Sequence, residues 1–169
     1  GLHIDNINIY INAHEVPIMD GSSRPFVQMI EKVGIKKQNK KRKILNIKKS
    51  IEVSKNNSSV KIVPNNQFSI DFEIDFPSQL VSKQSCQLQL INGNYKTDIA
   101  AARTFGFEKD VEHLRSNGLA LGGSLDNAVV VGENKILNKD GLRYTDEFVR
   151  HKILDSIGDL YLAGAPILG

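Results

Sequence analysis

The sequence predicts an α+β fold in which helices pack on one face of a mostly antiparallel sheet. Hydrophobic and polar residues alternate over several short segments, which is typical of strands with one buried face. Elsewhere the hydrophobic residues recur every three or four positions, which is typical of amphipathic helices. With 40% hydrophobic and 24% charged residues, the 169-residue chain has the composition of a soluble globular protein with a core.

The first predicted elements are a strand and a helix. In residues 6–11 the isoleucines alternate with other residues, which predicts a half-buried strand. A helix then begins near Ser23, with Pro25 in its first turn, and Gly34 ends it. The predicted buried face of this helix consists of Phe26, Ile30 and Val33.

The segment from Lys36 to Lys49 carries eight basic residues and no acidic one. Such a run can bind nucleic acid, but this one lacks the interleaved aromatic side chains on which bases stack. We therefore interpret it as a solvated linker at a domain boundary and expect no nucleic-acid partner. The basic run leaves open the alternative of a weak attraction to an anionic membrane surface or substrate.

Strands dominate the middle of the chain. The clearest covers residues 68–76, where phenylalanine and isoleucine alternate with Asp71, Glu73 and Asp75. Shorter strands are predicted at residues 51–53, 60–63, 86–90 and 128–131. Turns are predicted at residues 56–58, at Asn92-Gly93 and at residues 138–141.

Two further helices are predicted, at residues 107–116 and 145–162. The side chains that line one side of the first are Phe107, Val111 and Leu114. The second has Thr145 as its N-cap and acidic residues in its first turn, where the helix dipole favours negative charge. Its hydrophobic stripe, which should face the core, consists of Val149, Ile153, Ile157 and Leu160.

The last helix also carries a polar stripe. His151 and Asp155 are four residues apart and lie within about 40° of each other around the helix axis. An imidazole nitrogen and a carboxylate oxygen at this spacing can bind a divalent metal ion. A polar row that also includes Lys152 and Asp159 is more often a solvated helix face, and the spacing alone leaves both interpretations open.

Six segments in the same order carry a recognisable pattern. They are Gly1–Asn6, Glu15–Ser22, Ala102–Phe107, Gly118–Asp126, Leu137–Arg143 and Phe148–Leu160. Together they span nearly the whole chain and resemble the UDP-3-O-acyl-N-acetylglucosamine deacetylase family, the zinc-dependent deacetylases of lipid A biosynthesis. The chain resembles a family member truncated at both ends.

The resemblance implies two domains, each a two-layer sandwich of β-α-α-β type, whose helical layers face each other across the active site. Residues 1–43 would be the C-terminal remnant of the first domain together with the basic linker. Residues 44–169 would be most of the second domain, with an inserted β-α-β unit near residues 103–136.

The resemblance also implies the chemistry. The family hydrolyses the acetamide of UDP-3-O-acyl-N-acetylglucosamine, the committed step of lipid A and lipopolysaccharide synthesis in Gram-negative bacteria. His151 and Asp155 correspond to two of three protein ligands of Zn2+, although the same donor types suit ferrous iron. Thr104 corresponds to a threonine that hydrogen-bonds the reacting carbonyl oxygen. Asp159 corresponds to an aspartate that orients a catalytic histidine.

Substrate contacts are implied as well. Lys152 corresponds to a substrate-binding lysine, and Phe105 and Phe107 lie in a matching motif. The passage for the acyl chain corresponds to Val111, Ala120, Leu125, Asn127 and Val130. Asn127 departs from the apolar lining that such a passage needs, and the two valines could equally be ordinary core residues. The preferred acyl length stays open.

Three family residues have no counterpart in this chain: the glutamate general base, the third zinc ligand and the catalytic histidine. The remaining histidines, His3, His14 and His113, match none of these roles. We therefore expect the isolated chain to be inactive, although it derives from an amidohydrolase. A non-catalytic module that binds an acylated nucleotide-sugar is the alternative.

The remaining expectations concern the surroundings of the chain. Cys86 is the only cysteine, so no internal disulfide can form, which fits a reducing compartment and the cytoplasmic location that the resemblance implies. No segment approaches the roughly 20 apolar residues that span a bilayer. We expect a monomer close to, but not within, a membrane, with a UDP-linked acylated glucosamine as its partner.

Overall fold

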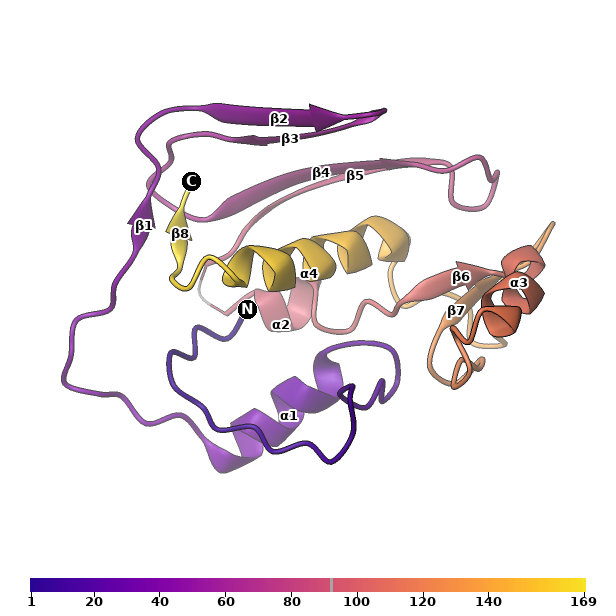
Figure 1. Cartoon of the computed structure of the whole chain (residues 1–169), viewed down its shortest axis with the longest axis horizontal. Helices are drawn as coiled ribbons and strands as arrows, with labels where there is room; N and C mark the ends of the chain where they lie inside the picture. Colours follow the sequence, from indigo (N-terminus) through magenta and orange to yellow (C-terminus); the bar gives the residue numbers. More distant parts are fainter. Residues whose placement is uncertain (92) are drawn as a thin grey trace.

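A long helix lies under antiparallel strands in the computed structural model, which describes residues 1–91 and 93–169 (Figure 1). The helix is α4 (Glu147–Tyr161), and the strands are β4 (Ser69–Asp75) and β5 (Lys83–Gln89). These two strands pair along their full length, from Ser69 opposite Gln89 to Asp75 opposite Lys83. The combination of helices and antiparallel strands confirms the predicted α+β class.

The alternation predicted for residues 68–76 is confirmed. Ile70 and Phe72 pack against the core, whereas the acidic residues of the strand, Asp71, Glu73 and Asp75, are exposed. Cys86 and Leu88 on β5 face the same core. The hairpin therefore presents an apolar face to α4 and a charged face to solvent, as the period of two requires.

The core lies between this hairpin and α4, in two adjoining clusters. The buried residues of the first cluster are Val27, Tyr95, Ile99, Ala100, Ile153 and Ile157. Those of the second are Ile74, Val81, Val129, Val131, Phe148 and Val149. Both clusters draw on α4, so this helix organises the core.

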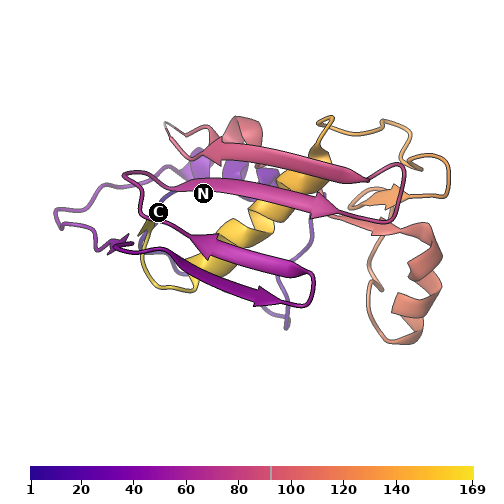
Figure 2. The same ribbon diagram turned by 90° about the horizontal axis from the view of Figure 1, so that it is seen from above.

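A second hairpin, β2 (Ile51–Lys55) and β3 (Ser58–Ile62), lies beside the first when the molecule is seen from above (Figure 2). The short strands β1 (Leu45–Asn46) and β8 (Ile167–Leu168) pair in parallel. The remaining helices near the core are α1 (Arg24–Val33) and α2 (Tyr95–Asp98). Every helix within the described residues is too short or too polar to cross a membrane.

A β-α-β unit projects from one end of the molecule (Figure 1). Its elements are β6 (Phe105–Phe107), the 3-10 helix η1 (Glu108–Asp110), α3 (Val111–Ser116) and β7 (Val129–Val131). β6 and β7 pair in parallel, with Phe105 opposite Val129. The predicted domain limits at residues 43 and 44 stay a prediction.

Several local predictions were wrong. Residues 6–11 form no strand, because no other described segment pairs with them, and their isoleucines are exposed. On α1 the buried residue is Val27, whereas Val33 is 88% exposed, because only the first half of α1 reaches the core. Leu160 lies exposed near the end of α4. Phe107 belongs to β6 because it pairs with Val131.

The turns at residues 56–58 and 138–141 are present in the structure. Asn56 has a positive φ between β2 and β3, and the Gly141 N–H donates to the carbonyl of Asn138 at 3.0 Å. The turn predicted at Asn92-Gly93 includes Asn92, which lies outside the described residues.

Phe148 allows a direct test of the core. Its side chain is fully buried and packs edge-to-face on Phe105, with ring centroids 4.8 Å apart. We expect Phe148→Ala to lower the free energy of unfolding by about 3–5 kcal/mol, since it leaves a cavity in the centre of the fold. Leu162→Ala is the matched control, because Leu162 is 88% exposed at the end of the same helix. Urea unfolding measures both, and equal effects would contradict the assigned core.

Candidate active site

The candidate site centres on His151, which α4 holds against the segment of residues 101–104. The imidazole is buried, and its Nδ1 lies 3.0 Å from the carbonyl oxygen of Ala102. A carbonyl oxygen can only accept a hydrogen bond, so Nδ1 carries the proton in this contact. The lone pair of a neutral imidazole is then on Nε2, which is the arrangement found in metal-binding histidines.

Asp155 lies one turn further along α4, on the side of the free imidazole nitrogen. Its Oδ1 is 3.4 Å from Nε2 of His151. One unprotonated nitrogen and one carboxylate oxygen at the same point are donors that suit zinc. Among residues 1–91 and 93–169, no group of three or more histidine, cysteine or acidic residues could hold a metal ion. Within the described residues, His151 and Asp155 therefore form a pair of candidate donors.

Lys152 lies at the edge of the same site. Its Nζ is 3.0 Å from Oδ2 of Asp155 and 5.5 Å from the centre of the Phe105 ring. The ammonium group is partly exposed, so it can exchange these contacts for an anionic ligand at little cost. The structure thus brings together four predicted site residues, His151, Lys152, Asp155 and Phe105.

The backbone of Thr104 is fixed from two sides. Its N–H donates to the carbonyl of Gly21 at 2.8 Å, and its carbonyl accepts from the N–H of Val129 at 2.8 Å. Gly21 has a φ of 81°, and a Cβ there would lie 2.0 Å from the Asn127 carbonyl oxygen. Only glycine allows this close approach, so Gly21 helps to set the position of Thr104.

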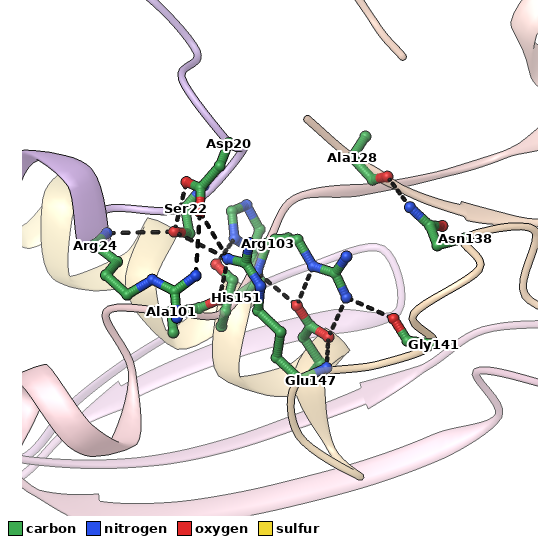
Figure 3. A network of polar contacts seen from close by, with 12 residues as sticks. Asp20, Ser22, Arg24, Ala101, Arg103, Ala128, Asn138, Gly141, Glu147 and His151 are labelled. Carbon is green, nitrogen blue, oxygen red and sulfur yellow. Dashed lines mark hydrogen bonds and ion pairs between the residues drawn. The ribbon is translucent and has the colours of Figure 1, made fainter. Parts of the chain in front are cut away.

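A buried carboxylate lies one turn before His151 on α4 (Figure 3). Glu147 is fully buried, and its Oε1 accepts from the backbone N–H and from Nε of Arg103, both at 2.9 Å. Its Oε2 accepts from Nη2 of Arg103 at 3.0 Å and from the N–H of Arg143 at 2.6 Å. Four donors therefore satisfy both carboxylate oxygens.

These hydrogen bonds set the ionisation of Glu147. Burial alone would raise the pKa of its carboxyl group, but the hydrogen bonds from Arg103 and Arg143 outweigh this effect and lower the pKa. Glu147 is therefore an anion in the folded protein at neutral pH.

Arg143 extends this network to the N-terminal segment. Its Nη1 lies 2.8 Å from Oδ2 of Asp20 and 3.0 Å from the carbonyl oxygen of Ala101. Asp20 also accepts from the hydroxyl of Ser22 at 2.8 Å. The pKa of Asp20 is lowered because these contacts outweigh its partial burial. These contacts thus connect three segments near His151: residues 20–22, 101–104 and 141–147.

Comparison with known proteins gives the family. The family model described as "LpxC: UDP-3-O-acyl N-acetylglycosamine deacetylase" matches residues 1–169. The chain belongs to this family.

Three similar relatives, all named UDP-3-O-acyl-N-acetylglucosamine deacetylase, match the whole chain. The protein of Syntrophus aciditrophicus is 50% identical over 169 residues, which cover 54% of that relative. Those of Campylobacter hominis and Shewanella violacea are both 52% identical, with 58% and 56% of their lengths covered. The chain therefore spans about half the length of the curated relatives it matches.

The residues predicted to line the family's acyl passage lie in the β-α-β unit. Val111 and Val130 are half-buried, whereas Ala120 and Leu125 are exposed. The amide of Asn127 bonds the backbone of Ser124 and Gly122, at 2.8 and 2.9 Å, so its polar group serves the loop. Of the other predicted site residues, Phe107 packs on Phe76, with ring centroids 5.8 Å apart. Asp159 is exposed on α4.

The sequence analysis missed the role of Glu147. Its place in the first turn of a helix suggested only a favourable interaction with the helix dipole. The spacing contained a signal, because residues 147, 151 and 155 are four apart and so share one face of α4. The partner, Arg103, is 44 residues away in sequence, and only the fold brings it to that face.

The lowered pKa of Glu147 predicts acid sensitivity. A carboxyl group whose pKa is lower in the folded than in the unfolded protein stabilises the fold fully above its unfolded pKa of about 4.3. That contribution is lost as pH falls through the folded pKa. We expect the free energy of unfolding to decrease below about pH 4.3, and Glu147→Gln to reduce this dependence.

Urea unfolding at a series of pH values between about 7 and 3 measures the effect. Glu112→Gln is the control, because it removes an exposed carboxylate from α3 and should leave the pH dependence as in the unmodified chain. An unchanged dependence in Glu147→Gln would contradict the assignment.

Proposed function

We propose that this chain forms part of a zinc-dependent deacetylase that hydrolyses the acetamide of UDP-3-O-acyl-N-acetylglucosamine. The observation that carries the proposal is the geometry of His151, whose Nδ1 bonds the Ala102 carbonyl while Nε2 faces Asp155. In a chain that belongs to a deacetylase family, this pair of donors is best explained as part of a metal site.

His151 and Asp155 are proposed to be two of three protein ligands of the metal. When bound, zinc polarises a carbonyl group and makes water a better nucleophile at neutral pH. The third ligand, the general base and the catalytic histidine would come from other parts of the complete protein. These parts correspond to regions of the relatives that this chain does not span. The donor types also suit ferrous iron, so the working metal is part of the test.

Thr104 and Lys152 are proposed to act on the substrate. The Thr104 hydroxyl would donate a hydrogen bond to the carbonyl oxygen as negative charge develops there, which stabilises the transition state. Lys152 is partly exposed beside the metal pair and would bind an anionic group. Asp159 would orient a histidine supplied by another part of the protein.

The β-α-β unit is proposed to hold the acyl chain of the substrate. Half-buried Val111 and Val130 would contact its methylene groups, each of which contributes about 0.8 kcal/mol when buried. Phe105 and Phe107 would line the entrance. We further propose that the protein is a cytoplasmic monomer and that its amphiphilic substrate brings it close to a membrane surface.

The two-ligand pair favours a second candidate for the isolated chain. Two protein ligands hold zinc poorly, because catalytic zinc sites use three. By itself the chain would then act only as a binding module for the acylated nucleotide-sugar. The complete gene product that contains the chain would carry the deacetylase activity.

His151→Ala tests the metal site in the complete gene product. We expect it to lose bound zinc, measured by elemental analysis, and at least about 100-fold in kcat, since the ligand set is broken. His113→Ala is the matched control, because His113 is exposed on α3. The isolated chain should hold far less than one zinc per chain. Full zinc content and activity in His151→Ala would refute the proposed site.

Thr104→Val tests the proposed transition-state contact. It removes a hydroxyl while keeping the shape of the side chain, and we expect kcat to fall about 10²–10³-fold with KM little changed. Thr97→Val is the control, because the exposed Thr97 hydroxyl bonds the Asn94 carbonyl and the Asp98 carboxylate, away from the site. Steady-state kinetics on the complete gene product decide the matter, and a kcat within a factor of a few of the unmodified enzyme rules the role out.

A further inference from the structure

One peptide group connects Glu147 to His151. The carbonyl of Ala102 and the N–H of Arg103 belong to the same planar peptide unit, and they point in opposite directions because the bond is trans. The N–H donates to Oε1 of Glu147 at 2.9 Å, and the carbonyl accepts from Nδ1 of His151 at 3.0 Å. Both side chains come from α4 and lie one turn apart.

This connection makes the two contacts mutually dependent. A planar peptide can turn only as a unit, so fixing its N–H also fixes the direction of its carbonyl. That direction decides which imidazole nitrogen of His151 holds the proton, because the carbonyl binds only a protonated nitrogen. The same peptide therefore links the Glu147 carboxylate to Nδ1 of His151.

The neighbouring contacts hold the carboxylate in place. The Arg143 N–H donates to Oε2 of Glu147 at 2.6 Å, and its side chain donates to the carbonyl of Ala101 at 3.0 Å. The Arg103 guanidinium binds both oxygens of Glu147 and the carbonyl of Gly141. The Glu147 carboxylate is therefore hydrogen-bonded by both Arg103 and Arg143, and it cannot turn without breaking several of these bonds.

We infer that Glu147 is a positioning residue, which orients the Ala102–Arg103 peptide so that His151 keeps its proton on Nδ1 and leaves Nε2 free. The value of this arrangement for metal binding rests on the proposed function. The tautomer itself does not, because it follows from hydrogen bonds within the described chain.

The tautomer can be measured directly on this chain. The 15N chemical shifts of the His151 ring, recorded at a pH where the imidazole is neutral, distinguish a protonated Nδ1 from a protonated Nε2. We expect the Nδ1-protonated form to dominate in the unmodified chain. Dominance of the other tautomer there would overturn the inference without any variant.

Glu147→Gln tests the cause. An amide has one acceptor oxygen and an NH2 group, which would face hydrogen-bond donors that now bind a carboxylate. We expect the peptide to turn and the Nε2-protonated form to rise several-fold. Asp146→Asn is the matched control, because it removes one charge from the same end of α4, where Asp146 contacts Arg150, and should keep the native tautomer. A native tautomer in folded Glu147→Gln refutes the inference.

Glu147→Asp covers the case in which Glu147→Gln does not fold. It keeps the charge but is one methylene shorter, so its oxygens cannot reach the N–H groups of Arg103 and Arg143 together. We expect a shift of the tautomer in the same direction. A folded Glu147→Asp with the native tautomer would count against the inference as strongly as the first variant.

A second readout separates this inference from the proposed function. In the complete gene product we expect Glu147→Gln to weaken zinc binding about 10–100-fold and to lower kcat more than it changes KM. Asp146→Asn should do neither. If the unmodified protein binds no zinc, the proposed function fails, while the 15N shifts still decide whether Glu147 sets the tautomer.

Discussion

The structure depends on a buried ion pair, Glu147 with Arg103. Removing a carboxylate and a guanidinium from water is costly, and the cost is offset only when every hydrogen-bonding position is filled. Here both carboxylate oxygens accept two hydrogen bonds each, and none of the buried side-chain polar atoms in the described part of the chain lacks a partner. The pair therefore fixes the position of α4 against Arg103, which is 44 residues away in sequence.

α4 combines the core and the site in one element. One face carries Phe148, Val149 and Ile153 into the core, and another carries Glu147, His151 and Asp155 at intervals of four residues. Tight packing of the hydrophobic face limits the rotation of the helix. The polar residues of the other face therefore keep fixed positions against residues 101–104. The position of the metal-type donors thus follows from the packing of the hydrophobic ones.

The errors of the sequence analysis share a physical cause. Hydrophobic periodicity reports which face of an element is apolar, but burial also requires a surface to pack against. The isoleucines of residues 6–11 alternate as in a strand, yet no described strand pairs with them. Val33 and Leu160 lie on the apolar faces of their helices, but each is near a helix end that extends beyond the core. Phe107 was assigned to a helix because a period of four began there, whereas its backbone pairs with β7.

The sequence by itself determined the fold class, the strands near residues 68–76 and 86–90, the approximate extent of the last helix and the spacing of His151 and Asp155, because these follow from periodicity within short segments. Six ordered segments also pointed to the family. Only the tertiary structure decided which residues orient the site. The Ala102 carbonyl and Arg103 contact α4 across 49 and 44 residues. Every residue has a backbone carbonyl, so the sequence does not show which of them makes such a contact. The buried role of Glu147 therefore follows from its surroundings, which no local pattern describes.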